Sequence, residues 1–291
     1  VVPYTVRYYY EGTTNPVFTN SDGSEYYDYY EDNRKSLVIA YAKGKVGYKA
    51  DDVQKSLVVI KGGVNEIIFY YSKDEDATYY EVIHHLMGVN GNQLTSHTLA
   101  YNANKGEEVE ITSATVAPLD FAGFTFDEDY AGTKREGTAT ADPILQLHLY
   151  YVEDQVNLKY EVVGGETGGG VVSRDQETLG AAYGVAQGSV ATPKPGYKFV
   201  GWYSHWDCEE DQLLSTNPNW VPTKADTALW VDGTTYYAKF EEKEITINYE
   251  VVGPAGVTGF GSVNPTTETV KVISGNPSSI AMASSNVYKF V

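Results

Sequence analysis

Apolar and polar residues alternate along much of the chain. From Val156 to Val162 every second side chain is apolar, and residues 245–251 repeat the pattern. A period of two is typical of a β-strand with one buried and one solvated face. Helical periodicity is weak, and the best short helix candidates are Asp51–Leu57 and Asp207–Leu214. The pattern therefore predicts an all-β or a β-rich α+β protein.

The predicted strands recur in a fixed order. Residues 158–164 resemble residues 247–253 at an offset of 89, and Tyr197–Val200 matches Tyr288–Val291 at an offset of 91. Looser copies in the first half share the order of opening strand, glycine–aromatic landmark, tyrosine-bearing closing strand and charged joint. The landmarks are Gly47-Tyr48, Gly123-Phe124 and Gly196-Tyr197, and the closing strands are Ile67–Tyr71, Leu147–Tyr151 and Thr235–Phe240. We therefore expect tandem repeats, numbered one to four here, at 1–74, 75–154, 155–243 and a truncated 244–291.

The size of the repeats and their joints predicts how they are organised. Each complete repeat has about 75–90 residues, enough for a small core of its own. The joints are short and charged and lack runs of glycine and serine, so we expect an elongated, semi-rigid rod. Because no closing strand follows in repeat four, we expect residues 244–291 to pair poorly and to exchange their amide hydrogens faster than the rest.

Composition narrows the possible partners. The chain has 39 acidic and 21 basic residues, a formal charge of −18. This charge repels phosphate backbones, so we expect no nucleic-acid partner. No apolar run is long enough for a membrane span. The one cysteine, Cys208, can form neither a disulfide within the chain nor a cysteine zinc cluster.

Residues that could carry catalysis or bind a metal are sparse. His84 and His85 are adjacent on a predicted strand, so their rings point to opposite faces and do not chelate one metal. The acidic clusters lack the spacing of an EF-hand loop. The glycine-rich segment Gly164–Gly170 lacks the lysine of a phosphate-binding loop, and no Gly-x-Ser-x-Gly motif occurs. We therefore expect no enzyme activity, no catalytic residue, no metal site and no cofactor.

The most unusual local feature is the segment Ser24–Glu31, which places four tyrosines among acidic residues. Neighbouring side chains of an extended chain point to opposite sides, so these rings cannot all join one core. Exposed tyrosines can stack on the C–H faces of sugars, while carboxylates accept hydroxyl protons. The candidate ligand-binding residues are therefore Tyr26, Tyr27, Tyr29 and Tyr30. The alternative is that the rings pack over their own repeat or a neighbouring one.

The repeats resemble two families of bacterial surface domains. The Tyr-x-Val opener, the glycine–aromatic landmark and the terminal Phe-Tyr-Tyr or Leu-Tyr-Tyr strand make repeats one and two similar to mucin-binding-protein (MucBP) repeats. Repeat three resembles the internalin-type B repeat (Listeria–Bacteroides repeat) through Pro195–Tyr203 and Thr234–Phe240. Insertions at Ser24–Asn33 and Ser204–Lys224 depart from these patterns. Within the Pro195–Tyr203 string, we expect Trp202 to pack in the core, as large aromatics at strand period usually do.

The resemblance implies a fold and a function. Both families are similar to small β-grasp (ubiquitin-like) folds and occur as tandem arrays in Gram-positive adhesins anchored to the cell wall. The resemblance thus implies that the chain is a monomeric, extracellular, non-catalytic fragment of a surface adhesin. Such an adhesin would bind host or environmental glycans or glycoproteins such as mucin. Two alternatives stay open: a purely structural stalk that presents a distal domain, and a substrate-targeting part of a larger secreted enzyme.

Overall fold

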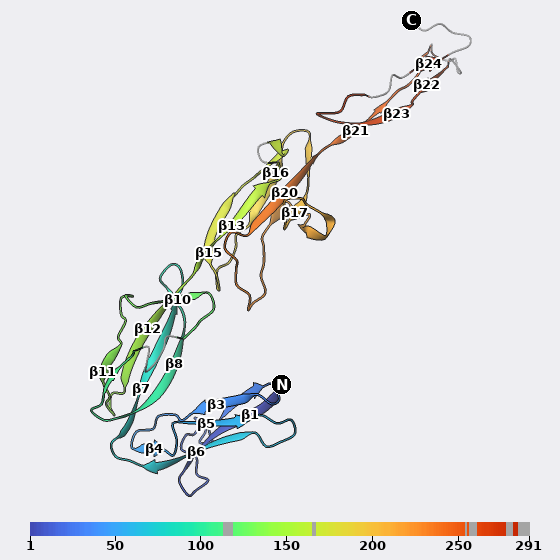
Figure 1. Cartoon of the computed structure of the whole chain (residues 1–291). Coiled ribbons are helices and arrows are strands. Elements are labelled where there is room, and N and C mark those ends of the chain that lie inside the picture. The colour runs from blue at the N-terminus through green and yellow to red at the C-terminus, as the bar shows by residue number, and fades with distance from the viewer. Residues whose placement is uncertain (113–118, 165–166, 254, 256–260, 278–281, 285–291) are drawn as a thin grey trace. The chain divides into compact units, whose positions relative to one another are not determined.

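The computed structural model describes residues 1–291 except 113–118, 165–166, 254, 256–260, 278–281 and 285–291. Contacts divide the chain into two compact units, Val1–Asp154 and Gln155–Val291, and each is described by itself. Strands arranged in several small sheets dominate the described residues (Figure 1), so the prediction of a β-rich fold is confirmed.

The two helix predictions are wrong. Residues 51–57 contribute to strand β5 (Gln54–Val58), which pairs antiparallel with β3 (Leu37–Tyr41). Alternate residues of β5 are half-buried, which is the period of a strand. Residues 207–214 contain one short 3₁₀ turn, Glu210–Gln212, followed by strand β18 (Leu213–Ser215). The described residues therefore include no α-helix, and the α part of the predicted α+β class is not found among them.

The N-terminal unit begins with a four-stranded mixed sheet. In order across the sheet, its strands are β2 (Asp28–Asp32), β1 (Val2–Tyr10), β6 (Glu66–Lys73) and β4 (Tyr48–Ala50). The first and closing strands, β1 and β6, run parallel, and both edge strands run antiparallel to their neighbours. The inward residues of this central pair, among them Val6, Tyr8, Phe69 and Tyr71, form the core. Alternation along β1 and β6 thus buries one face of each strand.

A second sheet in the same unit has the same strand order. It consists of β8 (Gln93–Asn104), β7 (Ala77–Met87), β12 (Leu145–Glu153) and β10 (Phe124–Asp127). Its central pair, β7 and β12, is again parallel. A small antiparallel pair, β9 (Glu108–Glu110) and β11 (Glu136–Thr138), accompanies it. Val82, Leu147, Leu149 and Tyr151 are buried along the central pair.

The C-terminal unit contains a third sheet of this kind. Its strands are β15 (Gln176–Gly180), β13 (Gln155–Val162), β20 (Thr235–Glu242), β17 (Tyr197–Tyr203) and the added edge strand β18. The first and closing strands, β13 and β20, are parallel once more. A smaller sheet consists of β14 (Gly170–Val172), β16 (Ser189–Pro193) and β19 (Asn219–Trp220). Trp202 is fully buried among Tyr160, Phe199 and Trp220, so its predicted core position is confirmed.

The remainder of the C-terminal unit forms two short antiparallel pairs. They are β21 (Glu244–Asn248) with β23 (Thr267–Lys271), and β22 (Ser262–Asn264) with β24 (Met282–Ser284). The sequence match at Tyr288–Val291 lies outside the described residues. The faster amide exchange expected for 244–291 stays a prediction.

The glycine landmarks seen in the sequence have one structural role in all three sheets. Gly47, Gly123 and Gly196 all have a φ near +80°, a conformation that glycine adopts without steric cost. The carbonyl oxygen of each accepts a hydrogen bond, of 2.8–3.0 Å, from a backbone N–H in the joint after the closing strand. The donors are Asp74, Asp154 and Lys243. Each glycine landmark is therefore hydrogen-bonded to the joint that follows the closing strand of its own sheet.

A tyrosine–carboxylate pair also recurs between the first and second strands. The Tyr8 hydroxyl donates to Asp28 at 2.5 Å, and the Tyr160 hydroxyl donates to Glu177 at 2.6 Å. Tyr249 donates to Glu268 in the same way. In the second sheet His84 takes the corresponding position, since it lies opposite Leu149 as Tyr8 lies opposite Phe69. The sequence repeat thus extends to a buried polar contact.

Candidate ligand-binding site

The N-terminal unit contains a groove of about 620 Å³ that collects aromatic rings. Its aromatic lining residues are Tyr4, Tyr8, Phe18, Tyr30, Tyr41 and Tyr79, and its ionisable ones are Asp28, Lys43, Glu81 and His97. We call this site the aromatic groove. A second hollow in the unit, of about 770 Å³, is lined by Glu11–Asn15, Asp51 and Tyr70, and so offers a single ring. Because ring surface is what a stacked ligand needs, the aromatic groove is the stronger candidate.

Strand pairing positions the first wall of the groove. Tyr4 on β1 lies directly opposite Tyr30 on β2, and their rings stack with centroids 5.3 Å apart. Tyr30 keeps 48% of its surface exposed, and Tyr41, at the end of β3, keeps 64%. Burial and the nearby charge of Asp28 raise the pKa of Tyr30, so it stays a neutral hydrogen-bond donor near neutral pH. This wall therefore combines accessible ring surface with phenol groups.

A close backbone approach fixes another part of the groove lining. Gly44 packs so tightly on Tyr79 that a Cβ atom added at position 44 would lie 2.1 Å from the Tyr79 Cβ. The Gly47 N–H also donates to the carbonyl oxygen of Ala77 at 2.9 Å. Position 44 therefore admits no side chain without a shift of Tyr79, which belongs to β7.

A charged cluster forms the floor of the groove. The Asp28 carboxylate accepts hydrogen bonds from the Tyr8 and Tyr26 hydroxyls, both at 2.5 Å, and lies 3.1 Å from the Lys43 ammonium. Burial alone would raise the pKa of Asp28, but the bonds from Tyr26 and Tyr8 and the charge of Lys43 hold it below its ordinary value. The same contacts raise the pKa of Lys43 against the effect of its burial. Both groups therefore stay charged near neutral pH.

We expect Tyr8→Phe to lower the free energy of unfolding of the N-terminal unit by about 1 kcal/mol. The variant removes one hydrogen bond to Asp28, while Tyr26 and Lys43 still satisfy the carboxylate. Urea unfolding of the whole chain, followed by hydrogen exchange of β1, measures the change. Tyr27→Phe is the control, because Tyr27 is exposed and its ring contact with Arg7 survives the change. Equal effects of the two variants would contradict the assigned role of the Tyr8 hydroxyl.

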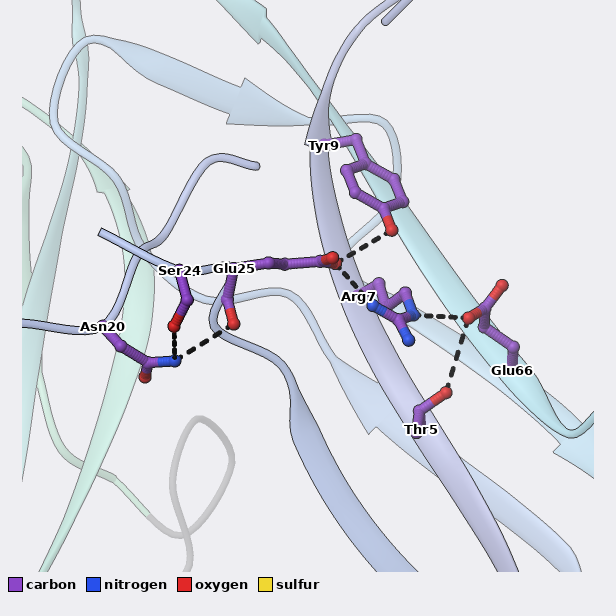
Figure 2. A network of polar contacts seen from close by, with 7 residues as sticks. All are labelled: Thr5, Arg7, Tyr9, Asn20, Ser24, Glu25 and Glu66. Carbon is purple, nitrogen blue, oxygen red and sulfur yellow. Dashed lines mark hydrogen bonds and ion pairs between the residues drawn. The ribbon is translucent and has the colours of Figure 1, made fainter. Parts of the chain in front are cut away.

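An arginine-centred network positions the tyrosine-rich segment. Arg7 on β1 contacts Glu25 at 2.7 Å and Glu66 on β6 at 2.6 Å (Figure 2). Tyr9 also donates to Glu25, at 2.8 Å. The Asn20 side chain bonds the Ser24 hydroxyl and the Glu25 carbonyl oxygen. Glu25 immediately precedes Tyr26, so this network fixes where the tyrosine-rich segment joins the sheet.

The structure separates the four tyrosines predicted from the sequence. Tyr30 lines the groove, whereas Tyr26 is half-buried and does not line it, although it bonds the lining residue Asp28 and accepts a bond from Lys43 at 3.0 Å. The Arg7 guanidinium lies over the Tyr27 ring, 4.6 Å from the centroid of that ring. Tyr29 is exposed and bonds Glu31. As expected from the alternation, the rings do not share one core.

Four groove tyrosines were missed by the sequence analysis. They are Tyr4 and Tyr8 on β1, Tyr41 on β3 and Tyr79 on β7. The pairing of β1 with β2 places Tyr4 opposite Tyr30, and Tyr79 packs on Gly44 of the groove lining. Alternating apolar residues indicate strands in the sequence, but the pairing partners of a strand are not readable from one chain.

The histidines and the cysteine considered in the sequence analysis do not form a second candidate site. His84 is buried and His85 is half-exposed, so the prediction that they point to opposite faces is confirmed. The described residues contain no group of three or more His, Cys, Asp or Glu side chains arranged for a metal ion. In the described part of the chain, no helix is long and apolar enough to cross a membrane. Burial, followed by the charge of Asp207, raises the pKa of the Cys208 thiol, although Lys239 opposes this.

Comparisons with known proteins include a structural likeness. No protein-family model and no curated protein matches the chain. Among solved structures, the chain is similar to one described as the Bacillus anthracis TIE protein, at 11% sequence identity and a TM-score of 0.24. The match covers 68% of this chain and 46% of that structure, so this chain spans less than half of its length. A TM-score of this size assigns no fold.

Proposed function

We propose that this chain is a non-catalytic part of a bacterial cell-surface adhesin that binds glycans or glycoproteins, such as mucins, through the aromatic groove. The observation that carries the proposal is the groove itself, where the exposed rings of Tyr30 and Tyr41 lie above the charged floor of Asp28 and Lys43. Ring faces supply apolar contact to sugar C–H groups, and phenol and carboxylate groups supply hydrogen bonds.

The proposal includes the repeat fold expected from the sequence. A mixed four-stranded arrangement with a parallel central pair recurs three times, which supports small β-grasp-like repeats in tandem. Because the first and closing strands of each sheet are parallel neighbours, the chain enters a repeat at one end and leaves at the other. This connection supports the proposal of an elongated rod.

Glycan and mucin binding by the whole chain tests the function. We expect Tyr30→Ala combined with Tyr41→Ala to weaken binding at least tenfold, which corresponds to about 1.4 kcal/mol. Tyr29→Ala is the matched control, because Tyr29 is also exposed, on the same strand as Tyr30, but does not line the groove. Unchanged circular dichroism of each variant shows that the sheets persist.

A purely structural stalk is the second candidate, favoured by the parallel entry and exit strands. It predicts no binding above background to any glycan, mucin or host glycoprotein. Equal loss of binding in the groove variant and in Tyr29→Ala would reject the groove while retaining an adhesive surface elsewhere.

A further inference from the structure

The aromatic groove is lined by more acidic than basic side chains. Asp28 and Glu81 carry carboxylates, Lys43 carries an ammonium group, and His97 adds a positive charge only when it is protonated. Two carboxylates against one ammonium group give the lining a formal charge of −1 while His97 is neutral. The charge of the whole chain, −18, has the same sign. A ligand that enters the groove therefore meets a negative potential from the lining and from the rest of the protein.

The ammonium group of the lining is engaged by the protein itself. The Lys43 Nζ lies 3.1 Å from the Asp28 carboxylate and donates to the Tyr26 hydroxyl at 3.0 Å. It also lies over the rings of Tyr26 and Tyr8, at 4.7 and 5.8 Å from their centroids. An ammonium group has three N–H donors, so at most one is left for a ligand. Lys43 therefore offers an anionic ligand little beyond what Asp28 already takes.

Cations near the groove do not replace Lys43. Lys45 lies over the Phe18 ring, 5.5 Å from its centroid, but is not a lining residue. Arg7 is held by ion pairs with Glu25 and Glu66 and does not line the groove either. An anionic group in the groove would therefore lose hydration without gaining an ion pair of its own, and burying a charge without a partner is costly.

The remaining groups of the groove suit an uncharged sugar. The exposed rings of Tyr30 and Tyr41 offer apolar surface to the C–H groups of a sugar ring. Carboxylates accept hydrogen bonds, and hydroxyl groups are the donors that an uncharged sugar carries. Glu81 accepts a bond from the Gln146 side chain at 2.9 Å through one oxygen, which leaves acceptor sites on its carboxylate. The negative charge that disfavours an anion thus serves a hydroxyl donor.

We propose that the aromatic groove selects uncharged glycans over glycans that end in a carboxylate or sulfate group, and that Asp28 sets this preference. The inference rests on the proposed function, since it names the class of glycan that the groove takes. Asp28 acts in two ways, because it adds a negative charge and also holds the Lys43 ammonium away from a ligand. Glu81 adds the second negative charge.

The test compares the binding of three related glycans to the whole chain. The first glycan ends in galactose, the second carries an added sialic acid with an ionised carboxylate, and the third carries an added neutral hexose. We expect the sialylated glycan to bind about tenfold more weakly than the other two at low salt, because juxtaposed like charges disfavour a complex. Added salt should narrow this difference, since it screens charges near the surface.

Variants with the same change of charge locate the selectivity. Asp28→Asn removes the carboxylate and frees Lys43, so we expect it to bind the sialylated glycan at least about tenfold more tightly than the unmodified chain does. Glu81→Gln should shift the preference in the same direction and leaves the contacts of Asp28 intact, so the test does not depend on the folding of Asp28→Asn. Glu31→Gln is the control, because Glu31 is exposed on the same strand as Asp28 but does not line the groove. It should leave the ratio of the two affinities unchanged.

Four results would count against the inference. Equal binding of the sialylated glycan and the galactose-terminated one would overturn the selectivity while keeping the groove as a glycan site. An equal loss of binding with the added neutral hexose would overturn it as well, because bulk would then be the cause. The same holds if Glu31→Gln changes the ratio of affinities as much as Asp28→Asn and Glu81→Gln do. Absence of binding by all three glycans would reject the proposed function itself, and this inference with it.

Discussion

Replacing Trp202 by alanine is expected to lower the free energy of unfolding of the C-terminal unit by about 3–5 kcal/mol, the usual cost of removing a large buried aromatic side chain. The Trp202 ring has no exposed surface and lies within 6.2 Å, centroid to centroid, of the rings of Tyr160, Phe199 and Trp220. Its indole N–H donates to the carbonyl oxygen of Pro218 at 3.2 Å. The variant would therefore leave a cavity, while the Pro218 carbonyl oxygen keeps its hydrogen bond from the Ala191 N–H.

The same unit offers a matched control. Trp206 is 69% exposed, so Trp206→Ala is expected to change the free energy of unfolding by less than about 0.5 kcal/mol. All four tryptophans of the chain lie in the C-terminal unit, so tryptophan fluorescence during urea unfolding reports on that unit alone. Similar losses in the two variants would show that Trp202 is not the centre of this core.

Acidification is expected to destabilise the N-terminal unit by about 2 kcal/mol between pH 7.5 and pH 5, a value that follows from proton linkage at His84. Burial, and then the nearby His97 and His85, lower the pKa of His84 from 6.5 to about 4. Its Nδ1 lies 2.9 Å from the Tyr151 hydroxyl, and its Nε2 is buried without a hydrogen-bond partner within the described residues. The folded unit therefore holds His84 in its neutral form.

The direction of this effect follows from proton binding. Between pH 6.5 and pH 4 the unfolded chain binds a proton at His84 that the folded chain does not, so stability falls as the pH falls through this window. His148, whose pKa is also lowered by burial and by His85, acts in the same direction.

Hydrogen exchange of β7 across this pH range, corrected for intrinsic rates, measures the loss. His84→Gln should flatten most of the pH dependence, whereas His205→Gln, in an exposed loop of the other unit, should preserve it. A wild-type profile that is flat from pH 7.5 to pH 5 would contradict a neutral, buried His84.

Sequence periodicity predicted where the strands lie better than it predicted which strands pair with each other. The glycine landmarks and closing strands could be located because glycine at positive φ and alternating apolar residues leave direct marks in the sequence. The segment Asp51–Leu57 was mistaken for a helix because its few apolar residues fit both periods. In the structure, pairing with β3 makes this segment part of a strand.

The candidate site was predicted in part for the same reason. Alternation correctly indicated that the tyrosines at 26–30 diverge, but it could not show that the Tyr26 hydroxyl bonds Asp28 and Lys43. Register places Tyr4 beside Tyr30, and register depends on turns and on distant partners. Residues from separate strands therefore meet in a site that no local pattern describes.

The parallel pairing of β1 with β6 has a mechanical consequence for a chain under tension. A pull applied at both ends of this repeat draws the two strands past each other along their length, so their ladder hydrogen bonds bear the load together and do not open in sequence like a zipper. The ion pair of Arg7 with Glu66 crosses the same boundary. The bond from Asp74 to Gly47 lies just beyond the end of β6, where the pulling force enters the sheet. The geometry therefore resists extension of this repeat.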